Sequence, residues 1–185
     1  MAKFNYASGL PRTLKTKGYL PGHVTKAFGP RYIGAGFWDS ARTDTAEFGE
    51  FVEVNAGDEK AYEVLPVSNT TTAGELAVVV RDVVGAPTLT DGIVSGPKEQ
   101  LGLSLYMGTA GNKGKVVAIL GGGEPAVDGQ VYVGTATTAS TVAGVVYATN
   151  VATECVTATN WKFASTRFAP LQASGVYAVE VKYVG

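Results

Sequence analysis

The sequence contains one histidine and one cysteine, and this scarcity excludes several kinds of site. A zinc site built from these residue types needs three or four ligands, which His23 and Cys155 cannot supply. A single cysteine also excludes an internal disulfide framework. Any histidine-based catalytic triad would have to use His23, and no base stands out near Cys155. We therefore expect that the chain is not an enzyme and that it holds no metal or cofactor.

Long apolar runs are also missing. No stretch reaches the roughly 18 consecutive apolar residues that cross a bilayer as a helix. The N-terminal stretch MAKFNYASGLPRTLK lacks the apolar middle region of a secretory signal. These two features predict synthesis in the cytoplasm and no attachment to a membrane.

The glycine-rich stretch GNKGKV, at residues 111–116, has only a partial likeness to a phosphate-binding loop. That motif requires a glycine five positions before its Gly-Lys pair and a hydroxyl residue directly after the pair. This chain has Thr109 and Val116 at those positions. We therefore interpret the stretch as a β-turn.

Carboxylates are scattered, with two pairs close together in the sequence. A glycosidase places two carboxylates across a cleft, and the sequence alone leaves that possibility open. No cluster of tryptophans accompanies the pairs, so solvated side chains on a strand and its turn are the favoured interpretation. The pairs are Glu50 with Glu53 and Asp58 with Glu59.

Charge is distributed unevenly along the chain. Residues 1–45 carry seven basic and two acidic side chains, a net charge of +5, whereas residues 46–185 carry eight basic and fourteen acidic ones, a net charge of −6. Such a split indicates two parts with different uses. The basic part could be an ordinary solvated segment, or it could contact nucleic acid, a membrane surface or an acidic protein face. The wide spacing of its charges makes direct contact with nucleic acid the weaker choice.

Residues 1–45 show neither helical nor alternating periodicity, and Pro11, Pro21 and Pro30 interrupt them. The segment is nevertheless rich in aromatic side chains, in which disordered linkers are poor. We therefore predict an extended arm that lies on its own domain or on a neighbouring subunit. Aromatic and arginine side chains commonly dominate the energetics of protein interfaces. The predicted partner-binding residues are Arg12, Lys15, Lys17, Lys26, Phe28, Arg31, Tyr32, Phe37 and Trp38.

Residues 46–185 have the composition and pattern of a β domain. The chain contains 24 glycines, which suit tight turns, and its valine-rich stretches favour strands. Short apolar stretches recur about every ten residues, as in a sandwich or barrel. We predict a mainly β fold of about eight or nine short strands, with less than roughly a fifth helix. A last strand is expected over residues 176–184. Its buried face would consist of Tyr177, Val179, Val181 and Tyr183.

Several phrases follow one another along this domain. They are VEVNAGDEKAYEVLPVSN, GELAVVVRDVVGAP, GPKEQLGLSLYM, KGKVVAIL, VDGQVYVGTAT, TVAGVVYATN and the closing WKFASTRFAPLQASGVYAVEVKYVG. Their order resembles that of the structural cement proteins of tailed-bacteriophage heads. The resemblance covers about residues 45–185 of the chain.

The resemblance implies a capsid decoration protein that binds the outer surface of the assembled head. Such a protein bridges neighbouring capsomers and stabilises the shell against the pressure of packaged DNA. Its partners would be the major capsid protein and other copies of itself, as a trimer or dimer. It would be located in the virion after synthesis in the host cytoplasm. Members of the family have no catalytic residues that could be carried over to this chain.

Two other functions stay open at the level of sequence. A receptor- or glycan-binding β module of a phage tail or fibre would also have a β-rich fold, and it would show an exposed aromatic pocket and form trimers in the absence of a capsid. A hydrolase is the third possibility, but the sequence offers no set of residues that supports it.

Overall fold

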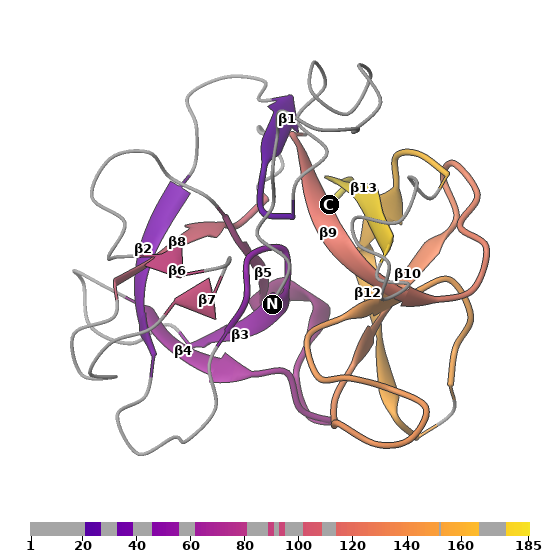
Figure 1. The fold of residues 1–185 in the computed structure, drawn as a ribbon, viewed down its shortest axis with the longest axis horizontal. Coiled ribbons are helices and arrows are strands. Elements are labelled where there is room, and N and C mark those ends of the chain that lie inside the picture. The colour runs from indigo at the N-terminus through magenta and orange to yellow at the C-terminus, as the bar shows by residue number, and fades with distance from the viewer. Residues whose placement is uncertain are drawn as a thin grey trace.

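The structure, a computed structural model, consists of two β-rich lobes that lie side by side (Figure 1). The first is built from strands between residues 33 and 106, and the second from a strand at residues 24–26 together with strands between residues 115 and 183. The structure describes residues 21–26, 33–38, 46–55, 62–80, 89–90, 93–94, 102–108, 114–151, 153–166 and 177–185.

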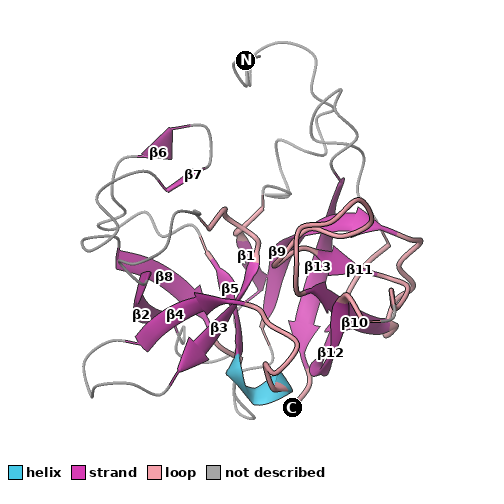
Figure 2. Cartoon of the chain, turned by 90° about the horizontal axis from the view of Figure 1, so that it is seen from below, coloured by secondary structure: helices cyan, strands magenta, loops and turns pink. Residues whose placement is uncertain are grey.

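The first lobe, which we call the barrel lobe, has five strands. They are β2 (Ile33–Trp38), β3 (Phe51–Asn55), β4 (Tyr62–Pro66), β5 (Leu76–Val79) and β8 (Gly102–Tyr106). They close into a barrel in the order β2-β4-β3-β5-β8, and every pair is antiparallel except β2 with β4. The 3-10 turn η1 (Ala73–Glu75), cyan in Figure 2, leads into β5. The Glu75 carboxylate accepts a hydrogen bond from the Thr72 N–H (2.8 Å) and so fixes the start of this turn.

The second lobe, which we call the sheet lobe, has six strands. They are β1 (Val24–Lys26), β9 (Lys115–Gly122), β10 (Gln130–Gly134), β11 (Val146–Tyr147), β12 (Cys155–Phe163) and β13 (Tyr177–Tyr183). Their order is β1-β9-β11-β10-β12-β13, and a further pairing of β13 with β9 makes the sheet return on itself. Only β11 and β9 pair in parallel among these strands. A separate hairpin joins β6 (Leu89–Thr90) to β7 (Ile93–Val94).

The mainly β fold predicted from the sequence is confirmed, since the three-residue η1 is the only helix in the described part of the chain. The predicted C-terminal strand is present as β13, in which Val179 and Val181 are fully buried. β1 and β2 lie within residues 1–45, where no strand is expected from the sequence. β1 belongs to the sheet lobe and β2 to the barrel lobe. The division of the chain at residue 45 stays a prediction. None of the described residues forms a helix long and apolar enough to cross a membrane.

Strand β9 is hydrogen-bonded along both edges. One edge pairs with β13 over six residue pairs. Three partners occupy the other edge of β9. β1 pairs with the start of the strand, and β11 pairs with its end. Between them, the Gly49 carbonyl accepts a hydrogen bond from the Ile119 N–H (3.1 Å). Residues 116–120 of β9 are all buried, so both faces of the strand are covered. This explains why its sequence is a continuous apolar run instead of an alternating one.

One hydrophobic core extends from the sheet lobe into the barrel lobe. In β3, Val52 belongs to the barrel's own cluster, whereas its neighbour Phe51 belongs to the cluster that fills the sheet lobe. The fully buried Trp161 packs edge-on against Phe51, with ring centroids 5.1 Å apart. It makes similar contacts with Tyr106 (6.0 Å) and Tyr183 (5.4 Å). Aromatic pairs in this geometry contribute about 0.5–1.5 kcal/mol each beyond the area that they bury.

Gly49 connects the two lobes through its backbone. Its N–H donates to the Val79 carbonyl in β5 (2.8 Å), and its carbonyl accepts from Ile119 in β9 (3.1 Å). Its φ of +84° lies in the left-handed region, and a Cβ here would come within 2.7 Å of the Pro21 Cβ and 3.0 Å of the Val117 carbonyl. Glycine meets both the conformational and the steric condition at this position.

Replacing Gly49 with alanine is expected to lower the free energy of unfolding by about 1–3 kcal/mol, because strain at positive φ adds to the clash with Pro21. The matched control is Gly74→Ala in η1, where a Cβ would meet no atom within 4 Å. This control should change the free energy of unfolding by less than about 1 kcal/mol. Chemical denaturation measures both variants, and equal stabilities would contradict the connecting role of Gly49.

Replacing Trp161 with alanine is expected to destabilise the protein by about 3–5 kcal/mol, because the cavity would lie in the core that joins the two lobes. Val127→Ala serves as the control, since Val127 is 57% exposed, and it should stay within about 0.5 kcal/mol of the parent. Thermal unfolding compares the two. A Trp161→Ala protein as stable as the control would show that the lobes do not depend on this core.

Candidate interaction site

The predicted partner-binding residues of the arm lie mostly outside the described residues. Lys26 ends β1, where its backbone is the register partner of Lys115. Phe37 and Trp38 lie in β2, which pairs with both β4 and β8. Their role in binding stays a prediction. The remaining residues, for which the structure offers no description, are Arg12, Lys15, Lys17, Phe28, Arg31 and Tyr32.

Groups that could carry chemistry are few among the described residues, where no three histidine, cysteine or acidic side chains gather as a metal site would require. Exposed His23 lies just before β1, and its carbonyl accepts a bond from the Val117 N–H (2.9 Å). Cys155 is half-buried, and burial raises the pKa of its thiol, which disfavours the nucleophilic thiolate. Asp58 and Glu59 fall outside the described residues.

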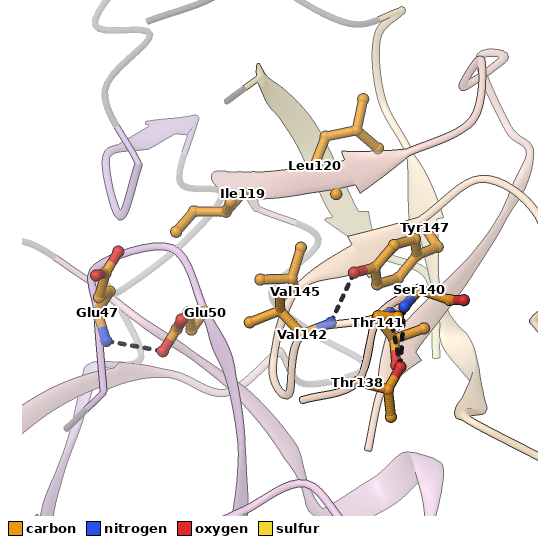
Figure 3. A pocket seen from close by; sticks show the side chains of 12 residues that line it. Glu47, Glu50, Ile119, Leu120, Thr138, Ser140, Thr141, Val142, Val145 and Tyr147 are labelled. Carbon is orange, nitrogen blue, oxygen red and sulfur yellow. Dashed lines mark hydrogen bonds between the residues drawn. The ribbon is translucent and has the colours of Figure 1, made fainter. Parts of the chain in front are cut away.

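A hollow of about 440 Å³ lies where the two lobes meet (Figure 3). The turn that precedes β3 forms one side of it, a loop of the sheet lobe forms the other, and β9 and β11 lie between them. Its volume is within the range of about 300–1,000 Å³ that is usual for ligand pockets. The lining residues are Glu47, Glu50, Ile119, Leu120, Gly121, Thr138, Ala139, Ser140, Thr141, Val142, Val145 and Tyr147.

The hollow is acidic on one side and apolar at its base. Glu47 is exposed, and the Glu50 carboxylate accepts a bond from the Glu47 N–H (2.8 Å), which holds the turn in shape. Ile119 and Val145 are almost fully buried beneath the hollow, and Val142 at its rim is 43% exposed. Among the described residues, no basic side chain lines the hollow. The arrangement suits a partner that offers both a cationic and an aliphatic side chain.

The loop that forms the second wall is held by a network of hydroxyl groups. The Glu154 carboxylate accepts hydrogen bonds from the hydroxyls of Thr138 (2.8 Å) and Thr141 (3.0 Å). The Thr141 hydroxyl is also within 3.0 Å of the Ala136 carbonyl. The Thr138 hydroxyl accepts bonds from the N–H groups of Ser140 (3.0 Å) and Thr141 (3.1 Å). These bonds fix the loop although most of its side chains are exposed.

Tyr147 closes the base of the hollow beneath this loop. Its hydroxyl accepts a hydrogen bond from the Val142 N–H (2.8 Å), as Figure 3 shows. Burial raises the pKa of Tyr147, so the phenol is neutral at physiological pH. The ring lies against Gly121, where a Cβ would come within 2.5 Å of a ring carbon. A larger residue at that position would displace the ring.

A further polar contact ties the loop to the barrel lobe. The Thr135 hydroxyl donates to the side-chain oxygen of Asn69 (2.8 Å). Asn69 lies in a turn in which the Ser68 N–H donates to the Thr71 hydroxyl (2.8 Å), and that hydroxyl donates to the Glu53 carboxylate. Glu53, one of the carboxylates noted in the sequence, is therefore occupied in holding this turn.

Sequence reasoning did not identify the hollow. The stretch TVAGVVYATN, at residues 141–150, is one of the short apolar stretches that indicate strands in the sequence, whereas the pairing there is limited to the two residues of β11. The cluster of threonine, serine and glycine in residues 134–144 is a loop signal that would have indicated part of the site. The remaining lining residues come from distant parts of the chain, and no sequence spacing shows that they meet.

No protein-family model matches the chain, and no curated protein matches it. The fold is similar to that of a chain in the solved structure of the capsid of Myoviridae phage XM1, with a TM-score of 0.54 and 19% sequence identity. The similarity covers 86% of this chain and 88% of that chain. At this level of identity the comparison establishes a shared fold.

Replacing Thr141 with valine is expected to lower the free energy of unfolding by about 1–3 kcal/mol, since Thr141 is 1% exposed and its hydroxyl satisfies the Glu154 carboxylate. Amide hydrogen exchange of residues 138–142 should become faster because the loop loses its support. Thr157→Val, on an exposed position of β12, is the control and should leave both quantities nearly unchanged. Unaltered exchange in Thr141→Val would show that the hydroxyl network does not hold the loop.

Proposed function

We propose that this chain is a capsid cement protein, which binds the outer surface of an assembled phage head, bridges neighbouring capsomers and stabilises the shell. The observation that carries the proposal is the similarity of fold to a chain of a phage capsid structure over most of both chains. The order of phrases between about residues 45 and 185 supports it independently, because it resembles that of cement proteins.

The described surface suits a protein that is stable alone and attaches to a shell assembled by other chains. Barrel closure and the pairing of β13 with β9 leave few open sheet edges, which would otherwise promote unwanted pairing. The large apolar side chains that are exposed in the described part of the molecule are only Val127, Val142 and Val184. Permanent interfaces are usually larger and more hydrophobic than such a surface would provide.

The arm would supply the additional attachment that this polar body needs. Its basic residues Arg12, Lys15 and Lys17 would contact acidic protein surface, and its aromatic residues Phe28 and Trp38 would act as anchors. Contacts between exposed charges weaken with salt, because the screening length falls from roughly 10 Å at 0.1 M to 3 Å at 1 M. Buried aromatic contacts do not weaken in this way.

Deleting residues 2–20 should leave the body folded, because Pro21 beside Gly49 and the pairing of β1 with β9 remain in place. We expect an unchanged unfolding temperature but a large fall in occupancy when the variant is added to heads stripped of the native protein. Cryo-electron microscopy of the heads measures occupancy for the variant and for the full-length chain. Equal occupancy would show that residues 2–20, which contain the basic residues Arg12, Lys15 and Lys17, are dispensable for attachment.

The full-length protein should also raise the temperature at which stripped heads release their DNA. A full-length protein that leaves this temperature unchanged and shows no density on the heads would contradict the cement function. Binding to immobilised host-surface glycans by the same preparation would then favour the receptor-binding module of a tail or fibre.

A further inference from the structure

The N-terminal twenty residues have a charge opposite to that of the hollow. They contain Lys3, Arg12, Lys15 and Lys17 and no acidic residue. In the stretch RTLKTK at residues 12–17, one leucine is placed among three of these cations. The hollow has carboxylates on one side and an aliphatic base, and none of the described residues that line it is basic. The segment therefore offers the combination of side chains that the hollow lacks.

The segment also leaves the body beside the hollow. Pro21, the first described residue, lies so close to Gly49 that a Cβ there would be 2.7 Å from it. Gly49 belongs to the turn whose Glu47 and Glu50 line the hollow. The Gly49 carbonyl occupies the edge of β9 at Ile119, next to the Val117 carbonyl that accepts a bond from the Gly22 N–H. Twenty extended residues span at most about 70 Å, which is enough to reach a neighbouring molecule.

We propose that the hollow receives residues 12–17 of a second copy of this chain. Leu14 would lie on the aliphatic base near Val142, and Arg12 and Lys15 would face the exposed carboxylate of Glu47. The proposal rests on the cement function, because an arm bound to its own body would link nothing, whereas an arm bound to a neighbour ties copies together.

Symmetry favours reciprocal exchange between two copies. In a two-fold arrangement each surface meets its equivalent on the partner. Because the arm starts at the wall of the hollow, two copies that bring these regions together place each arm beside the other's hollow. A pair of identical contacts would then form, and the second contact would benefit from the high effective concentration created by the first.

Cross-linking between full-length chains tests the exchange directly. In a Cys155→Ala background, one protein carries Thr16→Cys and another carries Ser140→Cys, on the exposed loop that lines the hollow. A short bifunctional thiol reagent should join the two proteins into a mixed dimer in an equimolar mixture. A partner with Val127→Cys, exposed but not among the lining residues, should give little product.

A charge reversal gives the matched comparison. Adding Glu47→Lys to the Ser140→Cys protein should lower the yield of mixed dimer roughly fivefold, as expected for changing one exposed attraction to repulsion. Glu124→Lys makes the same charge change at an exposed residue outside the hollow and should have little effect. Reversing Arg12 and Lys15 to glutamate on the other protein should restore the yield with Glu47→Lys.

Two results would overturn the inference. One is the absence of mixed dimer above the level of the Val127→Cys control. The other is a chain that carries both Thr16→Cys and Ser140→Cys and becomes cross-linked internally, while the mixture of single variants gives no dimer. This result would show that the arm binds the hollow of its own chain. Occupancy on stripped heads is measured separately. If the heads bind the protein but no mixed dimer forms, only the exchange is overturned. If the mixed dimer forms but the heads do not bind the protein, the exchange is supported and the cement function is overturned.

Discussion

Backbone hydrogen bonds of the turn before β3 hold the two lobes together, and much of the structure depends on them. The Gly49 peptide bonds to Val79 on one side and to Ile119 on the other, and the Phe51 N–H donates to the Gly144 carbonyl (2.7 Å). Buried backbone groups are costly to leave unpaired. A shift of one lobe against the other would break several of these bonds at once. The arrangement of the lobes is therefore set by the main chain, and the exposed side chain of Glu47 can serve another purpose.

Strands with a strong hydrophobic pattern could be predicted from the sequence. β13 alternates between its faces, and β9 is a continuous apolar run because both of its faces are covered. β1 has three residues, too few for any period to appear. β2 reads IGAGFW, and its glycines at positions 34 and 36 hide the alternation. Both strands were therefore missed. Their pairing depends on distant partners, such as Tyr106 for Ile33, 73 residues away, and Val116 for Val24, 92 residues away.

The hollow could not be predicted for a different reason, since its character depends on which carboxylates are occupied elsewhere. The sequence indicates an acidic body and a basic arm but does not distinguish one glutamate from another. In the structure Glu53 accepts bonds from a turn of the barrel lobe, and Glu154 accepts bonds from the threonine-rich loop. Glu47 instead lies exposed at the side of the hollow. Only the tertiary structure distinguishes Glu53 and Glu154, whose carboxylates hold loops, from Glu47, whose carboxylate faces the hollow.

The contrast between a fixed body and a long arm has consequences for binding to a repetitive surface. Association costs free energy for every side chain and loop that becomes ordered, about 0.5–1.5 kcal/mol for each long side chain that is immobilised. The wall of residues 138–142 avoids much of this cost, because its hydrogen bonds already fix the backbone and its exposed side chains are short. Binding of a basic arm with long side chains costs more ordering free energy, but the arm can extend to a neighbouring molecule. On a lattice of neighbouring copies, many such contacts of modest strength act together, so stable attachment does not require a large apolar interface on any single copy.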